Sequence, residues 1–245
     1  MNRYRITVAY DGSHYFGWQV QPHHVTVQAQ VEAALARLTG AHTKVHASGR
    51  TDQGVHARGQ VAHFDLEKGM APNVLKKGLN ALLPEDIRVR AAAKAPSTFH
   101  ARRTARGKEY RYFIWNDDVM DPCLRLYSTH VRRPLDVPAM RAAAAMLVGK
   151  HDFAAFTANP NRVVESTVRE VTHVKIVKRG KAIVIAAASD GFLYKMVRSI
   201  CGLLIRVGEG AVAPEEVRAI LASQQRTARV PTAPPQGLFL WRVWY

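Results

Sequence analysis

The order of periodic segments along this 245-residue chain restricts its fold more than any other feature. Residues 3–10 alternate between apolar and polar types, which is typical of a strand with one buried face. Residues 27–38 repeat apolar side chains at helical spacing, with Thr26 at the N-cap position and Gly40 just past the end. Two strands, a helix and a further strand then complete the first half, at 43–48, 59–66, 72–83 and 87–93.

The second half repeats this order more loosely. Its expected elements are a strand at 108–116, a helix at 138–148, strands at 168–178 and 181–188, a helix at 192–207 and a strand at 238–244. Each half therefore follows the order βαββαβ. We predict an α+β protein made of two ferredoxin-like (RRM-like) units, residues 1–102 and 103–245, each with helices on one face of an antiparallel sheet.

The charge balance indicates the kind of partner. Thirty-five Lys and Arg residues against 19 Asp and Glu residues give a net charge of +16, while 47% of the residues are hydrophobic, as in an ordinary globular chain. An excess of positive charge on a folded surface favours an anionic partner, and nucleic acid is the commonest one. The sequence therefore favours a nucleic-acid enzyme or a ribosomal-type binding protein.

Several classes of site and location are disfavoured. Cys123 and Cys201 lie far apart without CxxC spacing, which supports neither a disulfide framework nor a zinc site. The 11 histidines form no HExxH motif, and no GxGxxG or Walker loop is present, so we expect no metal and no cofactor. No apolar run approaches the length of a membrane span, and we expect a cytoplasmic protein that does not bind membranes.

Residues 49–57 hold the densest group of reactive side chains, reading Gly-Arg-Thr-Asp-Gln-Gly-Val-His-Ala. They connect two strands of the first half, and loops on rigid strands often carry functional residues. The alternative is a glycine-rich turn in which Asp52 caps a backbone amide. The local pattern does not decide between the two.

This run resembles the catalytic signature of the TruA family of tRNA pseudouridine synthases. Further resemblances follow in order along nearly the whole chain, at residues 10–12, 17–19, 99–102, 108–112, 149–153, 196–200, 237–238 and 243–245. The resemblance implies isomerisation of uridine to pseudouridine in tRNA, in a catalytic cleft between the two units. The reaction breaks the N1–C1′ bond and forms a C5–C1′ bond, with no redox change.

The resemblance also implies three catalytic residues. Asp52 is the expected catalytic carboxylate, attacking the base or C1′, or removing the C2′ proton; the sequence leaves these possibilities open. Arg198 is the expected ion-pair partner that keeps it ionised. Tyr110 is the expected ring that stacks on the uracil, with its hydroxyl available for proton transfer, whereas Tyr112 is expected in the core.

Other basic residues are candidates for contacts with tRNA. Arg50 is placed to insert into the stack that a flipped nucleotide leaves, or to hold its phosphate. A basic run at the expected boundary favours phosphate contacts and comprises Arg102, Arg103, Arg106 and Lys108. We expect Lys150, Arg162 and Lys195 to extend this track.

The resulting hypothesis is a homodimeric tRNA pseudouridine synthase that modifies uridines 38, 39 and 40 of the anticodon arm. The dimer and the positions are implied by the resemblance alone. The competing hypothesis is a non-catalytic, RRM-like RNA-binding protein, but we find no paired aromatic residues in the RNP pattern. DNA is not an expected partner, since no helix-turn-helix or zinc finger is evident.

Overall fold

The chain folds into two compact units, which are described separately below. The computed structural model describes residues 1–158 and 165–245. The first unit comprises Met1–Arg106 together with Phe239–Tyr245, and the second comprises Gly107–Leu238. The division expected from the sequence, 1–102 and 103–245, does not assign the last seven residues to the first unit.

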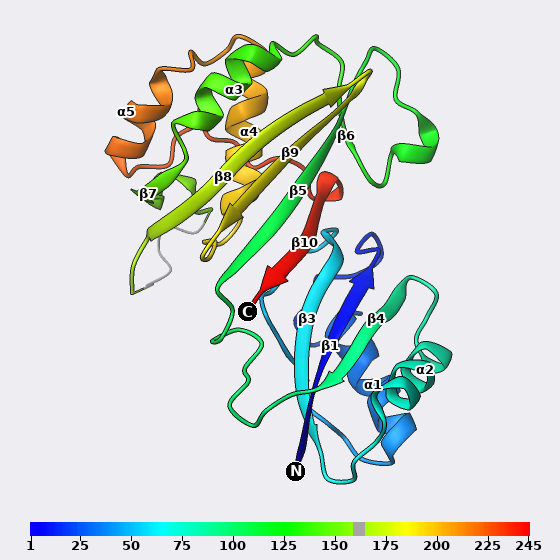
Figure 1. Cartoon of the computed structure of the whole chain (residues 1–245). Coiled ribbons are helices and arrows are strands. Elements are labelled where there is room, and N and C mark those ends of the chain that lie inside the picture. Colours follow the sequence, from blue (N-terminus) through cyan, green and yellow to red (C-terminus); the bar gives the residue numbers. More distant parts are fainter. Residues whose placement is uncertain (159–164) are drawn as a thin grey trace. The chain divides into compact units, whose positions relative to one another are not determined.

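The first unit contains a mixed sheet with two helices on one face (Figure 1). Its elements are β1 (Asn2–Tyr10), α1 (Val27–Thr39), β2 (His46–Ala47), β3 (His56–Leu66), α2 (Pro72–Leu82), β4 (Ile87–Lys94) and the end of β10 (Leu238–Trp244). Strand β1 pairs antiparallel with both β3 and β4, and β2 pairs antiparallel with β3. Strand β10 pairs parallel with β3, whereas the sequence predicted an antiparallel sheet.

The core of the first unit follows from the alternation in β1. Tyr4, Ile6, Val8 and Tyr10 are all buried, as their period of two predicts. Helix α1 begins after Thr26, whose hydroxyl accepts from Ala29 N–H, and it ends at Gly40 with φ of 76°. The strand expected at 43–48 is only two residues long, because side chains of α1 bind Val45: Glu32 accepts from its N–H and Gln28 donates to its carbonyl.

The second unit contains a larger set of elements than the sequence predicted. They are β5 (Gly107–Asn116), β6 (Thr129–Val131), α3 (Val137–Ala145), β7 (Gly149–Asp152), β8 (Val168–Arg179), β9 (Ala182–Ser189), α4 (Met196–Gly208) and α5 (Glu216–Ser223), with short 3₁₀ turns at Pro122–Leu124, Ala154–Phe156 and Pro235–Gly237. Its strands are ordered β5, β9, β8, β7, all antiparallel, and β6 pairs parallel with β5. Helices α3 and α4 pack on each other, and α3 packs on β8.

The α+β class is therefore confirmed, whereas the two ferredoxin-like units are not. Strands β6 and β7 and helix α5 have no place in the predicted order. The helix expected at 192–207 begins at Met196, because Lys195 has a left-handed backbone with φ of 58° and cannot continue a helix towards residue 192.

Candidate functional site

Asp52 lies in a tight turn between β2 and β3, with its side chain half-buried. The Val55 N–H donates to the Asp52 carbonyl at 3.2 Å and closes the turn. Gly54 has φ of 74°, a conformation that favours glycine. Thr51 is buried, with its hydroxyl 2.8 Å from the Tyr10 hydroxyl. The buried Thr51 before Asp52 and the buried Val55 after it therefore anchor the two ends of the turn.

A second segment, residues 10–19, packs directly against this turn. The Trp18 N–H donates to the Thr51 carbonyl at 3.1 Å. A side chain on Gly17 would place its Cβ 2.4 Å from the same carbonyl oxygen, and one on Gly12 would lie 2.1 Å from the Val55 carbonyl oxygen. Only glycine allows such close backbone contact. The resemblance marks both segments, but the sequence does not reveal that they pack together.

His56 connects these two segments from within the core. Its side chain is fully buried and its ring stacks on Phe239, with 4.5 Å between ring centres. Nδ1 lies 3.0 Å from the Gly12 nitrogen and 3.1 Å from Asp11 Oδ1. With its proton on Nε2 the ring accepts from the Gly12 N–H, and with a proton on Nδ1 it donates to Asp11. The sequence pattern gives this histidine no separate role, although it lies inside the 49–57 run.

Arg50 is exposed on the same loop, two residues before Asp52. Its Nε donates to Gln19 Oε1 at 3.1 Å. Gln19 belongs to the second segment, so this segment orients the arginine as well as the turn. A guanidinium has five N–H donors, and one such bond orients it without preventing contact with an anion.

The basic segment at 102–106 is exposed and held at both ends within the first unit. Nδ1 of His100 accepts from the N–H groups of Arg102 and Arg103, at 3.2 and 3.3 Å. The Arg106 N–H donates to the Trp244 carbonyl at 2.9 Å. The three arginine side chains are exposed. The segment therefore presents its cations on a fixed backbone.

Tyr110 and Tyr112 lie on the same face of β5 in the second unit. Tyr110 is 8% exposed, and its ring meets Phe192 edge to face at 5.3 Å. Tyr112 is fully buried, its hydroxyl bonded to Thr129 Oγ1 and donating to the Pro234 carbonyl, and burial raises its pKa. Its position in the core is as predicted.

Arg198 lies near the start of α4, half-buried and held by the 231–233 segment. Its Nε donates to the Ala233 carbonyl at 2.7 Å, and its own carbonyl accepts from the Ala233 N–H at 3.0 Å. One helical turn later, a Cβ on Gly202 would lie 2.0 Å from the Pro231 carbonyl oxygen. The absence of a side chain at Gly202 thus lets the backbone of the 231–233 segment lie directly against α4.

The remaining cationic candidates lie apart from one another. Lys108 is half-buried on β5, and Lys150 is exposed on β7. The left-handed Lys195 precedes α4, with its Nζ 4.9 Å from the centre of the Tyr194 ring. Arg162 lies outside the described residues.

The predicted site residues therefore divide between the two units. The first unit carries Asp52, Arg50, Arg102, Arg103 and Arg106, and the second carries Tyr110, Arg198, Lys108 and Lys195. Among residues 1–158 and 165–245, no group of three His, Cys, Asp or Glu side chains could hold a metal ion. No helix in this part of the chain is long and apolar enough to cross a membrane.

Comparison with known proteins gives a consistent result. A sequence profile described as tRNA pseudouridine synthase matches residues 6–102 and 143–245. Proteins named tRNA pseudouridine synthase A from Geotalea uraniireducens and Brevibacillus brevis are each 46% identical to this chain over 245 residues, covering 100% of both sequences. The protein of that name from Syntrophotalea carbinolica is 47% identical, covering 100% of this chain and 97% of its own length.

Proposed function

We propose, from the premise that the chain belongs to the tRNA pseudouridine synthase family, that it isomerises uridines 38, 39 and 40 of the tRNA anticodon arm. Family membership itself makes the chain a pseudouridine synthase that acts on tRNA. The three positions, the catalytic residues and the absence of a cofactor are parts of the proposal.

The chemistry requires no external reactant. The N1–C1′ bond breaks, the uracil turns, and C5 bonds to C1′ while its hydrogen leaves as a proton and N1 gains one. Atoms and electrons therefore balance without an oxidant, a reductant or a cofactor. What the protein must supply is a carboxylate at the sugar and base, a flat surface for the detached uracil, and groups that move protons.

The observation that carries the proposal is the way the fold holds Asp52. Its turn is anchored by the buried Thr51 and Val55, and the glycines of a second segment contact the turn backbone to backbone. A reacting group that is already held in its working position lowers the activation barrier, because orienting it costs no further entropy. A turn that only connects two strands needs no such support. We assign Asp52 as the catalytic carboxylate, acting as a nucleophile or as a base.

Two residues of the second unit complete the proposed machinery. Arg198 is the proposed ion-pair partner that keeps Asp52 ionised, and its Nε bond to Ala233 fixes the direction of its guanidinium. Tyr110 is the proposed stacking surface, since its ring is fixed edge-on by Phe192.

The tRNA is held by its phosphates in this proposal. Flipping the target base costs a few kcal/mol, and Arg50 would hold the nucleotide or fill the gap that it leaves. Arg102, Arg103, Arg106, Lys108 and Lys195 would contact the backbone, which suits recognition by shape at three adjacent positions. We further propose that the protein is a homodimer and acts in the cytoplasm, where its tRNA substrate would be met.

Release of tritium from tRNA carrying [5-³H]uridine tests the function, because C5 must lose its hydrogen. We expect release by the wild type and none by Asp52→Asn, with tRNA affinity unchanged within about threefold. Glu67→Gln is the matched control, since it removes an exposed carboxylate of the same unit outside the 49–57 loop, and it should retain activity. A folded wild type that binds tRNA but releases no tritium would instead support a non-catalytic RNA-binding protein.

A further inference from the structure

The face of the first sheet opposite α1 and α2 carries a group of exposed arginines. On β1, Val8 and Tyr10 point to the helices and are buried, so Ala9 between them points to the opposite face. Ala9 pairs with Arg88 of β4, which places the half-buried Arg88 on that face, and the exposed Arg90 follows at a bulge in the β1–β4 register. Arg5 belongs to it by the same alternation and is exposed.

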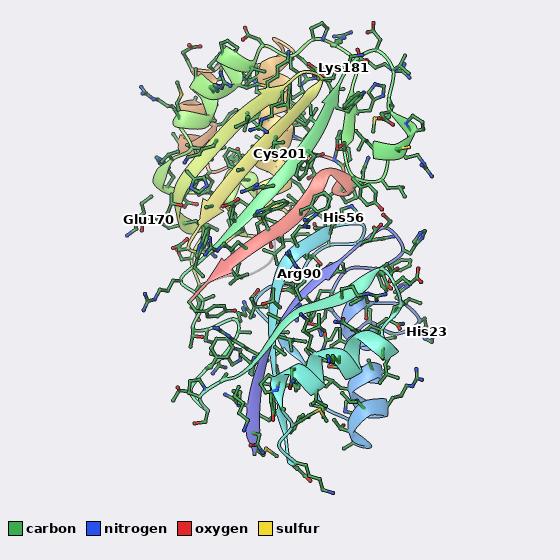
Figure 2. All side chains as sticks on the ribbon, turned by 45° about the vertical axis from the view of Figure 1, so that its right-hand side comes forward. His23, His56, Arg90, Glu170, Lys181 and Cys201 are labelled. Atoms are coloured by element: carbon green, nitrogen blue, oxygen red, sulfur yellow. The ribbon has the colours of Figure 1, made fainter. Side chains whose placement is uncertain are left out.

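Strand β3 adds Arg58 to the same face. Ala57 pairs with Tyr10 and is buried, so its neighbour Arg58 points the other way. The Arg58 guanidinium lies 5.3 Å from the centre of the Trp241 ring on β10. Arg90, labelled in Figure 2, donates from Nη1 to the Arg58 carbonyl at 3.1 Å and so reaches from β4 to β3.

Small side chains and an absence of free carboxylates make this face suited to a polyanion. In β1, β3 and β4, which are described in full, Asp65 is the only acidic residue, and Arg3 binds both of its oxygens at 2.8 and 2.7 Å. Beside the arginines, β1 and β4 carry the small residues Thr7, Ala9 and Ala91. An arginine resting on an aromatic ring also loses less freedom when it binds an anion.

We infer that the helix-free face formed by Arg5, Arg58 and Arg90 is a binding surface for the phosphate backbone of RNA. The choice of RNA as the ligand rests on the proposed function. The three arginines lie outside the 102–108 basic run and add to its proposed contacts with phosphates. The competing partner, an acidic protein surface, is disfavoured because the arginines are spread singly over three strands. A phosphate backbone needs only spaced cations.

The test compares two double variants that each remove two positive charges from the first unit. Arg58→Ala with Arg90→Ala alters the proposed surface, and Lys76→Ala with Lys77→Ala removes two exposed lysines of α2. The affinity for unmodified tRNA is measured between 50 and 200 mM salt. Each lost phosphate contact lowers the slope of log K against log [salt] by about 1, so we expect the arginine variant to lose about 2 and the lysine variant to match the wild type.

Two further measurements separate this inference from the function on which it rests. Arg58→Lys with Arg90→Lys keeps the charge, and this variant should recover most of the salt dependence. Tritium release at saturating tRNA should stay near the wild-type rate in the arginine variant, while the KM rises. A wild-type salt slope in the arginine variant, or an equal loss in the lysine variant, would overturn the inference even if tritium release establishes the reaction.

Discussion

Gly12 and Gly17 have no side chain, which lets their backbones contact the Asp52 turn directly. Each brings its backbone so close to the Asp52 turn that a Cβ atom would overlap a carbonyl oxygen, of Val55 and Thr51 respectively. Neither carbonyl can move without moving the turn. The position of the proposed catalytic carboxylate thus depends on two residues without functional groups, in a segment more than 30 residues earlier in the chain.

We predict that Gly12→Ala destabilises the fold by about 1–3 kcal/mol, as overpacking does, and lowers the rate of tritium release about a hundredfold by displacing Asp52. Thermal unfolding and the release assay measure the two effects. Gly191→Ala is the control, because its Cβ would meet Arg169 at no less than 3.6 Å. Full activity of Gly12→Ala would show that the turn tolerates displacement.

At the scale of elements, three histidines join β2, β3 and the basic segment. The His63 ring on β3 lies 5.1 Å from His46 on β2 and 4.6 Å from His100. Its Nδ1 accepts from the Ala101 N–H at 3.2 Å, which anchors the start of the basic segment. Burial, helped by the neighbouring histidines and Arg3 and opposed by Asp65, lowers the pKa of His63 to about 4.

This pKa predicts a loss of stability in acid. Between about pH 6.5 and about 4, the unfolded chain binds a proton at His63 that the folded chain excludes, so stability falls as the pH falls through that window. We expect the urea midpoint of the wild type to drop between pH 7 and pH 5. His63→Phe should show a smaller drop, and His42→Phe, in an exposed loop, should behave as the wild type. An equal drop in all three would rule out His63 as the cause.

At the scale of the whole molecule, the C-terminal residues belong to the same unit as the N-terminal ones. After the second unit, Phe239–Tyr245 completes the first unit: β10 pairs with β3, and the Tyr245 hydroxyl donates to the Ala101 carbonyl at 2.8 Å. The rings of Tyr245 and Phe99 lie 4.9 Å apart. The last residues therefore support the same unit that carries Asp52.

We predict that deleting residues 239–245 weakens the first unit selectively. Hydrogen exchange should speed up in β3 and in residues 99–106, because their partners are gone, while amides of the β8–β9 pair keep their protection. Arg242→Ala, an exposed change within the same segment, is the control and should leave exchange unchanged. Faster exchange throughout both units after the deletion would contradict a local role.

The long elements could be read from the sequence because their causes are local. The alternation in β1, the Thr26 cap and the Gly40 end of α1, and the buried face of β5 with Tyr112 are properties of a few adjacent residues. The short strands β6 and β7 and helix α5 escaped prediction, because three to eight residues carry too little periodicity to distinguish them from loops.

The sequence by itself determined the α+β class, the main helices and strands, and the run of residues that contains Asp52. Only the tertiary structure decided that residues 10–19 pack on that run, that Gln19 orients Arg50, and that the last seven residues join the first unit. The physical reason is the range of the interactions. Capping and periodicity act over a few residues, whereas these contacts join segments distant in the chain and exist only once both have folded.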